Sequence, residues 1–496
     1  MNSYGMLNDQ AVSTSKWLLT DILRNKLGFQ GLVVADYGSI THAFLRYRVA
    51  EGAKEAGILA LKAGMDVEQP GNQCYQHLVE AVESGELEEA HIDISLRRVL
   101  ETKFTLGLFE NPYGDGDFFN EIKKAENAEL SLEIAEKSMV LVKNKDNILP
   151  LKKNLKIALI GPNSDTKTNF FGGYSSVGSA STKSSDFDKS EEDTFLRMIY
   201  TGAITDNKEL LKSMGIEFED KPTPEQREII MNMLRENLNS DDSSKRVYKT
   251  NEEFVQLFYP DCNSVKDVLE EEFGKDQVLH AKGCNIFKSI DGGIEAVKAA
   301  IQQADIVIAV LGGKESMIDP EATCGENKDN INIGLEKPQL EMMEEVFKLN
   351  KPVISVIIDG RPLSTPLVSE HSKAVLYSWL PAQSGAEAIV NILTGKINPS
   401  GKLPVTIVKE TGQIPMYNSR LPLYIDINEY AEYIKTNQNT PLYPFGHGLS
   451  YTEFKYSDFN LDSTVHSDEE LNLSFKVNNV GSFAGDEIVQ LYFGSS

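Results

Sequence analysis

The sequence contains few basic residues relative to acidic ones. Its 496 residues include 49 lysines and arginines against 74 aspartates and glutamates, which gives a formal net charge of −25. Nucleic acids and anionic membrane surfaces bind proteins through basic patches, so this balance argues against both as partners. Because 41% of the residues are hydrophobic, we expect packed cores beneath an acidic surface. The length corresponds to roughly three domains.

Cysteine is also scarce, and its four positions are widely scattered: Cys74, Cys262, Cys284 and Cys324. No pair has C-x-x-C spacing or a histidine at a metal-ligand spacing, which argues against a disulfide scaffold and a zinc site. The phosphate-binding motifs G-x-G-x-x-G and G-K-[ST] are absent as well. A nucleotide-binding α/β protein is therefore the weakest alternative.

Long apolar runs are missing too. No run of the sequence reaches the length that spans a membrane. The first ten residues, MNSYGMLNDQ, lack the basic region and apolar core of a signal peptide. These absences predict a protein without a membrane partner and favour a cytoplasmic location.

The most informative stretch that is present surrounds Asp36. Residues 31–35 form a short apolar run with two valines, which predicts a buried strand that ends at this acid. Residues 13–27 have helical spacing, and Gly28 is a natural stop. A carboxylate at the C-terminal end of a barrel strand lies on the catalytic face. Strand-end aspartates are more often helix caps or turn residues, so spacing alone does not make Asp36 catalytic.

We expect residues 1–108 to form an α/β domain, followed by a linker over 109–145. Its other elements are a short strand at 65–68, which ends in acids, and helices at 49–63, 73–84 and 91–106. Two strands cannot form a closed parallel sheet, so this domain is either very small or incomplete. A further helix is predicted at 127–142, within the linker.

Residues 146–412 predict a second domain in which strands alternate with helices, as in a mostly parallel sheet. The expected strands are 155–160, 304–311, 352–358, 374–377 and 403–408, and the helices 294–303, 337–348 and 385–393. A charged stretch at about 183–262 interrupts this rhythm and is interpreted as an insertion.

The last part of the chain changes character. Residues 413–450 form a connecting segment, and 451–496 alternate apolar and polar residues at strand period. Strands are predicted at 454–461, 471–477 and 487–493. A complete β-sandwich needs about 100 residues, so these residues predict only the start of one.

A second candidate site lies in the polar loop 314–332, which follows a predicted parallel strand. This loop carries five carboxylates: Glu315, Asp319, Glu321, Glu326 and Asp329. Open α/β sheets bind ligands at such strand ends, but a solvated acidic loop explains the same composition. One carboxylate in each domain fits glycoside hydrolysis, in which retaining enzymes place a nucleophile and an acid about 5–5.5 Å apart.

Several separated stretches of the sequence match the motifs of a single protein family. They are MNSYGMLND, LLTDILRNKLGFQGLVVADYGSI, ALKAGMDVEQP, RRVLETKFTLGLFENPY, NPSGKLPVTI, YPFGHGLSYTEF and GDEIVQLYF. Together they resemble glycoside hydrolase family 3, the β-glucosidases and β-xylosidases. The resemblance implies the C-terminal part of a (β/α)8 barrel, then an α/β sandwich domain, then the start of a fibronectin type III-like domain.

The resemblance also assigns roles. Asp36 matches the family's catalytic nucleophile, and Tyr4 and Tyr37 match aromatic residues beside it that bind substrate. Glu326, in CGENKDNINIGLEKPQLEMM, is the best match to the general acid/base, although Asn330 replaces the usual arginine. Glu321 and Glu315 are the alternatives to Glu326.

The activity that the resemblance implies is hydrolysis, with retention, of terminal non-reducing β-linked glucose or xylose. The partner would be a small carbohydrate, no metal or organic cofactor would be needed, and homo-oligomerisation is left open. The family's earlier barrel strands, which hold the sugar, have no counterpart in this sequence, so we expect a chain truncated at both ends. The alternative is an inactive fragment or a non-catalytic remnant that binds carbohydrate.

Overall fold

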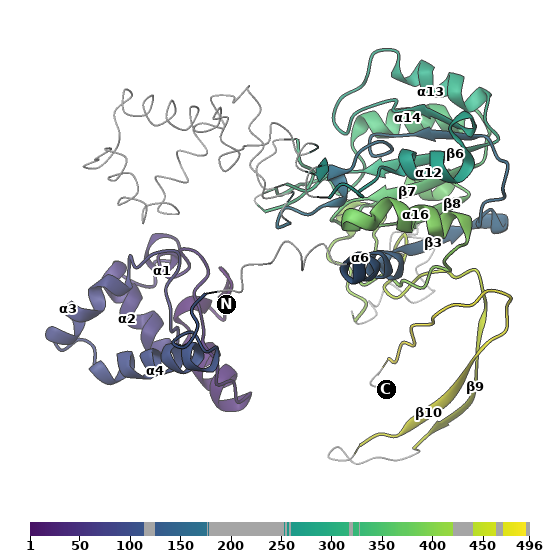
Figure 1. Ribbon diagram of the computed structural model, residues 1–496. Helices are drawn as coiled ribbons and strands as arrows, with labels where there is room; N and C mark the ends of the chain where they lie inside the picture. Colours follow the sequence, from purple (N-terminus) through teal and green to yellow (C-terminus); the bar gives the residue numbers. More distant parts are fainter. Residues whose placement is uncertain are drawn as a thin grey trace, which may run out of the picture. The chain divides into compact units, whose positions relative to one another are not determined.

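The computed structural model describes residues 1–113, 125–175, 177, 252, 255–256, 259–316, 321–326, 328–419, 440–462 and 470–492. The chain divides into two compact units (Figure 1). The first contains Met1–Phe118 and Ser185–Arg246, and the second contains Phe119–Ser184 and Val247–Ser496. Each unit is described by itself.

The first unit is largely helical. Its elements are β1 (Met6–Leu7), β2 (Gln10–Ala11), η1 (Val12–Thr14), η2 (Trp17–Lys26), α1 (His42–Leu45), α2 (Ala53–Ala63), η3 (Tyr75–His77), α3 (Leu78–Glu83) and α4 (Glu89–Thr105). The predicted helices at 49–63, 73–84 and 91–106 correspond to α2, to η3 with α3, and to α4. The helix predicted at 13–27 begins later and is a π-helix, η2.

Glycine ends α2 as the sequence predicts. Gly64 has φ +106°, a left-handed conformation that a side chain would strain. A Cβ at this position would also lie 2.9 Å from the hydroxyl of Thr20. The turn after α2 therefore needs glycine for two independent reasons.

The two strands predicted at 31–35 and 65–68 lie side by side and parallel, but they form a single bridge, Val34 to Val67. The amide of Ala35 donates to the Val67 carbonyl at 2.8 Å, and the amide of Asp66 donates to the Val33 carbonyl at 2.9 Å. Among the described residues of this unit, neither segment bridges to any other strand. The prediction of two full strands was wrong, since one parallel bridge is all that forms between them in the described residues.

The second unit contains a sheet, flanking helices and a separate hairpin. Its elements are α6 (Ala125–Ser138), β3 (Val140–Asn144), η4 (Lys145–Asn147), β4 (Ile157–Ile160), η5 (Thr168–Phe170), α12 (Val265–Phe273), η8 (Lys275–Gln277), β5 (Val278–Ala281), α13 (Gly293–Gln302), β6 (Ile306–Gly312), α14 (Lys337–Phe347), β7 (Val353–Ile358), α15 (Pro366–His371), β8 (Ala374–Tyr377), η9 (Ala382–Ser384), α16 (Gly385–Thr394), η10 (Thr411–Gln413), β9 (Phe454–Leu461) and β10 (Leu473–Asn479).

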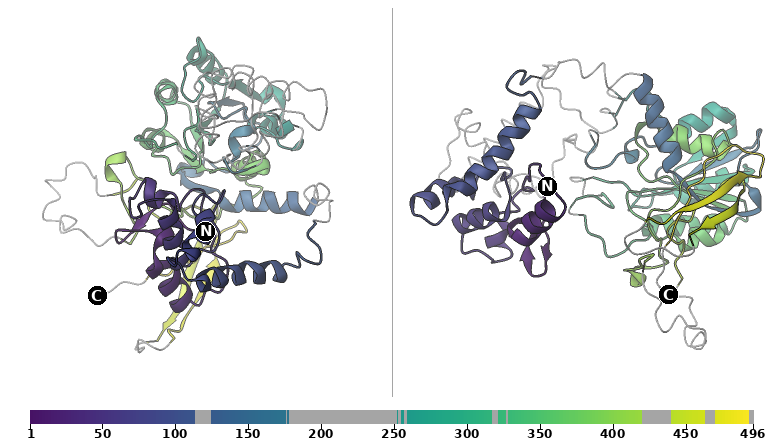
Figure 2. Two further views of the ribbon diagram at one scale, coloured as in Figure 1. Left: turned by 90° about the vertical axis from the view of Figure 1, so that its left-hand side faces the viewer. Right: turned by 90° about the horizontal axis from the view of Figure 1, so that it is seen from below.

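The six-stranded sheet has the order β3-β8-β7-β6-β4-β5, and all neighbours are parallel except β3 and β8. Side chains of α6, α12 and α16 pack in the core on one face. Those of α13, α14 and α15 pack on the other. Both helical layers are visible in Figures 1 and 2. β6 and β7 are buried along their whole length, as expected for central strands covered on both faces. The α/β character with a mostly parallel sheet is therefore confirmed.

Three predictions for this unit need correction. The helix predicted at 127–142 ends at Ser138, and residues 140–144 form β3, an edge strand of the sheet rather than a linker. No strand forms at 403–408, where only the bridge Ile407 to Tyr443 occurs, because Pro404 has no amide for a ladder. β5, α12 and α15 were missed. Nearly all of the insertion predicted at 183–262 lies outside the described residues.

β9 and β10 form an antiparallel hairpin, which confirms the strands predicted at 454–461 and 471–477. Residues 487–492 are not in a strand. The segment before the hairpin lies along the sheet edge, since the amide of Leu449 donates to the Leu141 carbonyl at 2.7 Å. Within the described residues, no helix has the length and apolarity needed to span a membrane.

Candidate active site

Asp36 lies directly after the bridged segment 31–35 in the first unit, and its backbone is held by Asn2. The Asn2 side-chain oxygen accepts hydrogen bonds from the Asp36 amide at 2.9 Å and from the Ser39 hydroxyl at 3.1 Å. The Asp36 carboxylate accepts the amide of Tyr37 through Oδ1 at 2.7 Å. Within the described part of the chain, Oδ2 accepts no hydrogen bond, so one oxygen is fixed and the other is available for chemistry.

The two tyrosines named from the sequence lie together beside Asp36. The Tyr4 hydroxyl donates to the Tyr37 carbonyl at 2.7 Å, and the Tyr37 side chain is 60% exposed. The Tyr4 ring also packs against His42, with ring centroids 5.2 Å apart. Burial, with a smaller effect of Arg46, lowers the pKa of His42, which keeps this ring neutral at physiological pH. No motif or spacing in the sequence identified His42.

Asp66 is a buried residue that contacts the segment leading to Asp36. Its fully buried carboxylate pairs with Arg24 at 2.7 Å and with Arg98 at 2.8 Å. It also accepts the Ser95 hydroxyl at 3.0 Å and the amide of Val33 at 2.8 Å. All of its interactions satisfy a buried charge, and the last one fixes the segment that leads to Asp36. Asp66 therefore orders the segment before Asp36, and the sequence indicated it only as an acid at the end of a strand.

The second candidate region is the loop after β6, which has two limbs that lie side by side. Residues 314–316 form the first limb and 323–326 end the second. The amide of Thr323 donates to the Lys314 carbonyl at 3.0 Å, and the amide of Ser316 donates to the Cys324 carbonyl at 3.2 Å. A parallel bridge joins Glu315 to Cys324. The loop is therefore an ordered structure in its described parts and not merely a solvated acidic segment.

The carboxylates of this loop differ in their hydrogen-bond and ion-pair partners. Glu326 accepts the Tyr174 hydroxyl at 2.6 Å, and Glu315 accepts the amide of Gly173 at 3.0 Å. Glu321 instead pairs with exposed Lys288 at 2.5 Å. Glu326 and Glu315 thus both contact the glycine-rich turn after η5. Asp319 lies outside the described residues.

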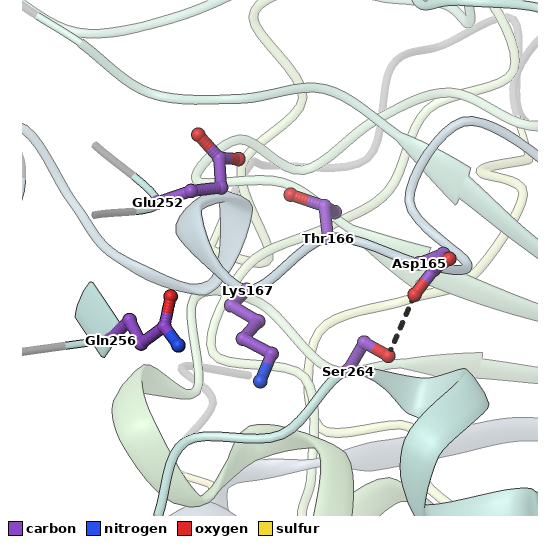
Figure 3. A pocket seen from close by; sticks show the side chains of 6 residues that line it. All are labelled: Asp165, Thr166, Lys167, Glu252, Gln256 and Ser264. Carbon is purple, nitrogen blue, oxygen red and sulfur yellow. Dashed lines mark hydrogen bonds between the residues drawn. The ribbon is translucent and has the colours of Figure 1, made fainter. Parts of the chain in front are cut away.

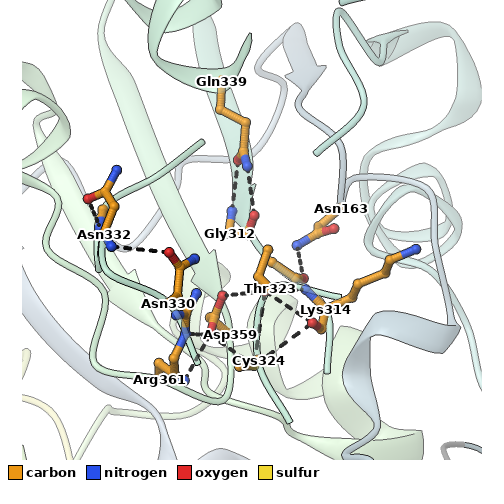
Figure 4. A network of polar contacts seen from close by, with 12 residues as sticks. Asn163, Gly312, Lys314, Thr323, Cys324, Asn330, Asn332, Gln339, Asp359 and Arg361 are labelled. Carbon is orange, nitrogen blue, oxygen red and sulfur yellow. Dashed lines mark hydrogen bonds and ion pairs between the residues drawn. The ribbon is translucent and has the colours of Figure 1, made fainter. Parts of the chain in front are cut away.

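The base of the loop is a buried polar network (Figure 4). Asp359, directly after β7, accepts the Thr323 hydroxyl at 3.3 Å, the Cys324 thiol at 3.4 Å and the Arg361 amide at 2.8 Å. Burial raises the pKa of Asp359, although these hydrogen bonds and the Arg361 charge act in the opposite direction. This residue was not identified from the sequence.

A glutamine fixes the point at which the loop leaves the sheet. The Gln339 side chain, from α14, donates to the Gly312 carbonyl at 2.7 Å and accepts the Gly312 amide at 3.0 Å. The side-chain amide of Asn163, which follows β4, donates to the Gly313 carbonyl at 3.1 Å. The strand order reverses between β4 and β6, and open α/β sheets bind ligands at such a point.

A pocket of about 270 Å³ lies at one end of the same unit, lined by Asp165, Thr166, Lys167, Glu252, Gln256 and Ser264 (Figure 3). The Ser264 hydroxyl donates to Asp165 at 3.0 Å. None of the site residues named from the sequence lines this pocket. The described residues also contain no group of three or more His, Cys, Asp or Glu side chains that could hold a metal ion.

Comparison with known proteins decides the family. Residues 1–102 match the N-terminal domain model of glycosyl hydrolase family 3, and residues 139–451 match its C-terminal domain model. The chain belongs to this family. The resemblance stated from the sequence motifs is therefore confirmed.

Relatives with curated names include both glucosidases and xylosidases. The chain is 30% identical to a periplasmic beta-glucosidase of Salmonella typhimurium over 99% of this chain and 57% of that protein. It is 30% identical to a beta-xylosidase of Formosa agariphila, over 96% of this chain and 56% of the relative. The chain thus spans little more than half the length of these relatives.

A solved structure shows the same fold. The beta-glucosidase from Listeria innocua in complex with isofagomine superimposes with a TM-score of 0.73 at 26% identity. The match covers 97% of this chain and 56% of the other.

Proposed function

We propose that this chain carries the catalytic groups of a retaining glycosidase that removes terminal, non-reducing β-linked glucose or xylose from oligosaccharides and glycosides. Family membership and the glucosidase and xylosidase relatives support the reaction type. The observation that carries the proposal is the carboxylate of Asp36, which has one oxygen bound to a backbone amide and the other available.

Asp36 is proposed as the nucleophile. Its carboxylate oxygen attacks the anomeric carbon, the glycosidic C–O bond breaks, and an acyl-linked glycosyl intermediate forms on Asp36. The amide of Tyr37 fixes Oδ1, which orients the plane of the carboxylate. Tyr4 and Tyr37 are proposed to contact the sugar beside it.

Glu326 is proposed as the general acid/base. In the first step its carboxylic acid protonates the leaving oxygen as the glycosidic bond breaks. In the second step its carboxylate takes a proton from water, whose oxygen bonds to the anomeric carbon and releases Asp36. The Tyr174 hydroxyl holds this side chain. The sequence of events needs no metal and no organic cofactor.

We interpret the first unit as the C-terminal part of a (β/α)8 barrel, and the six-stranded unit as an α/β sandwich domain. The hairpin β9–β10 is interpreted as the start of a fibronectin type III-like domain. Preference between glucose and xylose is left open, because relatives of both kinds match equally well.

A mechanism-based inactivator tests the nucleophile directly. We expect a 2-deoxy-2-fluoro-β-glycosyl substrate with a good leaving group to label the chain once, on the peptide that contains Asp36, as detected by mass spectrometry. The Asp36→Asn variant should remain unlabelled. Turnover of aryl glycosides with the label on a different residue would contradict the assignment.

A further inference from the structure

Asp359 is a buried carboxylate to which the proposed mechanism gives no chemical role. Its side chain is 2% exposed, and it follows β7 at the same edge of the sheet from which the loop after β6 departs. Removing a charged group from water is costly unless hydrogen bonds compensate. The identity of its partners therefore indicates what the carboxylate is for.

The partners of Asp359 lie on the limb that carries Glu326. The Thr323 hydroxyl donates to Oδ2 at 3.3 Å, and the Cys324 thiol donates to Oδ1 at 3.4 Å. These residues precede Glu326 by only three and two positions. A carboxylate that accepts from both side chains fixes the position and the direction of the backbone just before Glu326.

The same carboxylate also lies against the first limb. The Thr323 hydroxyl accepts the amide of Lys314 at 3.1 Å, and its single proton has two acceptors, the Lys314 carbonyl at 3.0 Å and Oδ2 of Asp359 at 3.3 Å. This one hydroxyl therefore links Asp359 to both limbs. A Cβ at Gly313 would lie 2.3 Å from Oδ2 of Asp359 and 1.9 Å from the Thr323 hydroxyl. The start of the loop therefore packs directly on this pair, and only glycine allows that approach.

Arg361 completes the surroundings of Asp359 with a backbone amide and a positive charge. The Arg361 amide donates to Oδ1 at 2.8 Å, and the Arg361 Nε lies 3.7 Å from the same oxygen. The Thr323 hydroxyl, the Cys324 thiol and the Arg361 amide thus direct hydrogen-bond donors at the carboxylate, whereas the Arg361 Nε lies nearby without a hydrogen bond to it. Figure 4 shows Asp359 between Thr323, Cys324 and Arg361.

We propose that Asp359 is a positioning residue for acid/base catalysis, which holds the loop after β6 so that Glu326 is presented for proton transfer. This proposal rests on the proposed function of Glu326. Catalytic groups must be held within about 0.5 Å of their productive geometry, and a misplacement of about 1 Å costs on the order of 100-fold in rate. Asp359 itself touches no substrate in this account.

The first test measures the loop without using activity. Hydrogen exchange of the Thr323 and Ser316 amides, which join the two limbs, is compared between the wild-type chain, Asp359→Ala and Thr323→Val. Loss of a buried hydrogen bond to a charged group should speed exchange of these amides on the order of ten- to hundredfold. Asp359→Asn, which keeps one acceptor oxygen, should give a smaller increase.

Ser355→Ala is the matched control. Its hydroxyl is buried on the same strand, β7, and lies 2.9 Å from the Ser372 hydroxyl, away from the loop. This variant should leave exchange of the limb amides unchanged. Unchanged limb exchange in Asp359→Ala, or an equal rise throughout the second unit, would overturn the positioning role.

The second test uses aryl β-glucosides whose leaving groups differ in acidity. A dinitrophenolate departs without protonation, whereas a phenolate needs the acid. We expect Asp359→Ala and Thr323→Val to lower kcat/KM for the phenyl glycoside about 100-fold more than for the dinitrophenyl glycoside. Ser355→Ala should lower both equally or not at all. A merely structural loss of active protein would also lower both equally.

The two proposals fail in different ways. If wild type turns over glycosides with Asp36 labelled but the leaving-group preference of Asp359→Ala is unchanged, the positioning role alone is wrong. If Glu326→Ala keeps the wild-type leaving-group profile, the acid/base assignment fails. The role of Asp359 in catalysis then fails with it, whatever the exchange data show for the loop.

Discussion

Two buried aspartates, Asp66 in the first unit and Asp359 in the second, support the two candidate catalytic regions by different chemistry. Asp66 is neutralised by two arginines at 2.7 and 2.8 Å. Asp359 has one arginine nitrogen at 3.7 Å and otherwise takes hydrogen bonds from a hydroxyl, a thiol and an amide. Burial accordingly raises the pKa of Asp359.

This difference predicts what happens to each region when its buried carboxylate is removed. A carboxylate paired with two buried cations is part of a charge balance, so its removal leaves both cations uncompensated. A carboxylate bound mainly by neutral donors orders a loop, so its removal loosens that loop while the core persists. The following predictions test this contrast, starting from the nucleophile and acid that the two regions carry.

The largest effect is expected for Asp36→Asn. This change keeps the oxygen that accepts the Tyr37 amide but removes the nucleophile, so kcat for an aryl β-glucoside should fall by about 10⁴-fold or more. The control is Asp21→Asn, because Asp21 is an exposed aspartate of the same unit paired with Lys16. Near-normal turnover by Asp36→Asn would remove Asp36 from the mechanism.

Glu326→Ala should have the next largest effect. Loss of general acid catalysis should lower kcat/KM for a phenyl β-glucoside about 10²- to 10⁴-fold, with a much smaller loss for the dinitrophenyl glycoside. Azide should restore turnover and yield a β-glycosyl azide, because the small anion enters the space left by the carboxylate.

Glu321→Ala and Glu315→Ala are the comparison variants for Glu326. Glu321 pairs with Lys288 at the surface, so its variant should behave like wild type. Glu315 binds the amide of Gly173, so its variant should lower rates without azide rescue. Azide rescue in Glu315→Ala and not in Glu326→Ala would transfer the acid/base role to Glu315.

These regions also show what the sequence could and could not predict. Asp36 was singled out, and the strands β4, β6, β7 and β8 were predicted, because periodicity and family motifs are local in sequence. The contacts that support the site join residues far apart, such as Tyr174 with Glu326 and Asp66 with Arg24. No periodic pattern records such pairs, and a lone acid at a strand end looks the same whether it is solvated or buried.

The edge strand β3 shows that local sequence patterns can also misplace the boundary between two elements of the fold. Residues 127–138 have strong helix formers, and the helical pattern was extended through Val140 and Val142, which favour strands. The structure places this short apolar run beside β8 in the sheet. Tertiary pairing thus decided a boundary that local propensity left ambiguous.

Asp66→Ala should destabilise the first unit strongly. Breaking a buried ion pair by removing one partner typically costs about 3–5 kcal/mol, and here two arginines lose their partner. Hydrogen exchange of the amides of α4 and of residues 31–35 should accelerate, while amides of β6 and β7 keep their protection. A matched control is Asp93→Ala, on α4. Equal protection in Asp66→Ala and wild type would show that the cluster contributes little to stability.

The smallest effect expected is a pH dependence of the free energy of unfolding that arises from Asp359. Its pKa is raised in the folded chain by burial, so the folded state holds this proton more tightly than the unfolded state does. The contribution of Asp359 to stability is therefore greatest below the unfolded pKa of about 3.9. It declines as pH rises through the raised folded pKa, by about 1.4 kcal/mol for each unit of difference.

Asp359→Asn removes this titration while keeping the size of the side chain. Urea unfolding of the second unit, followed between pH 4 and pH 7, should show the wild type losing stability relative to Asp359→Asn as pH rises. A wild type that instead gains stability relative to Asp359→Asn over this range would mean that the hydrogen bonds and Arg361 outweigh burial.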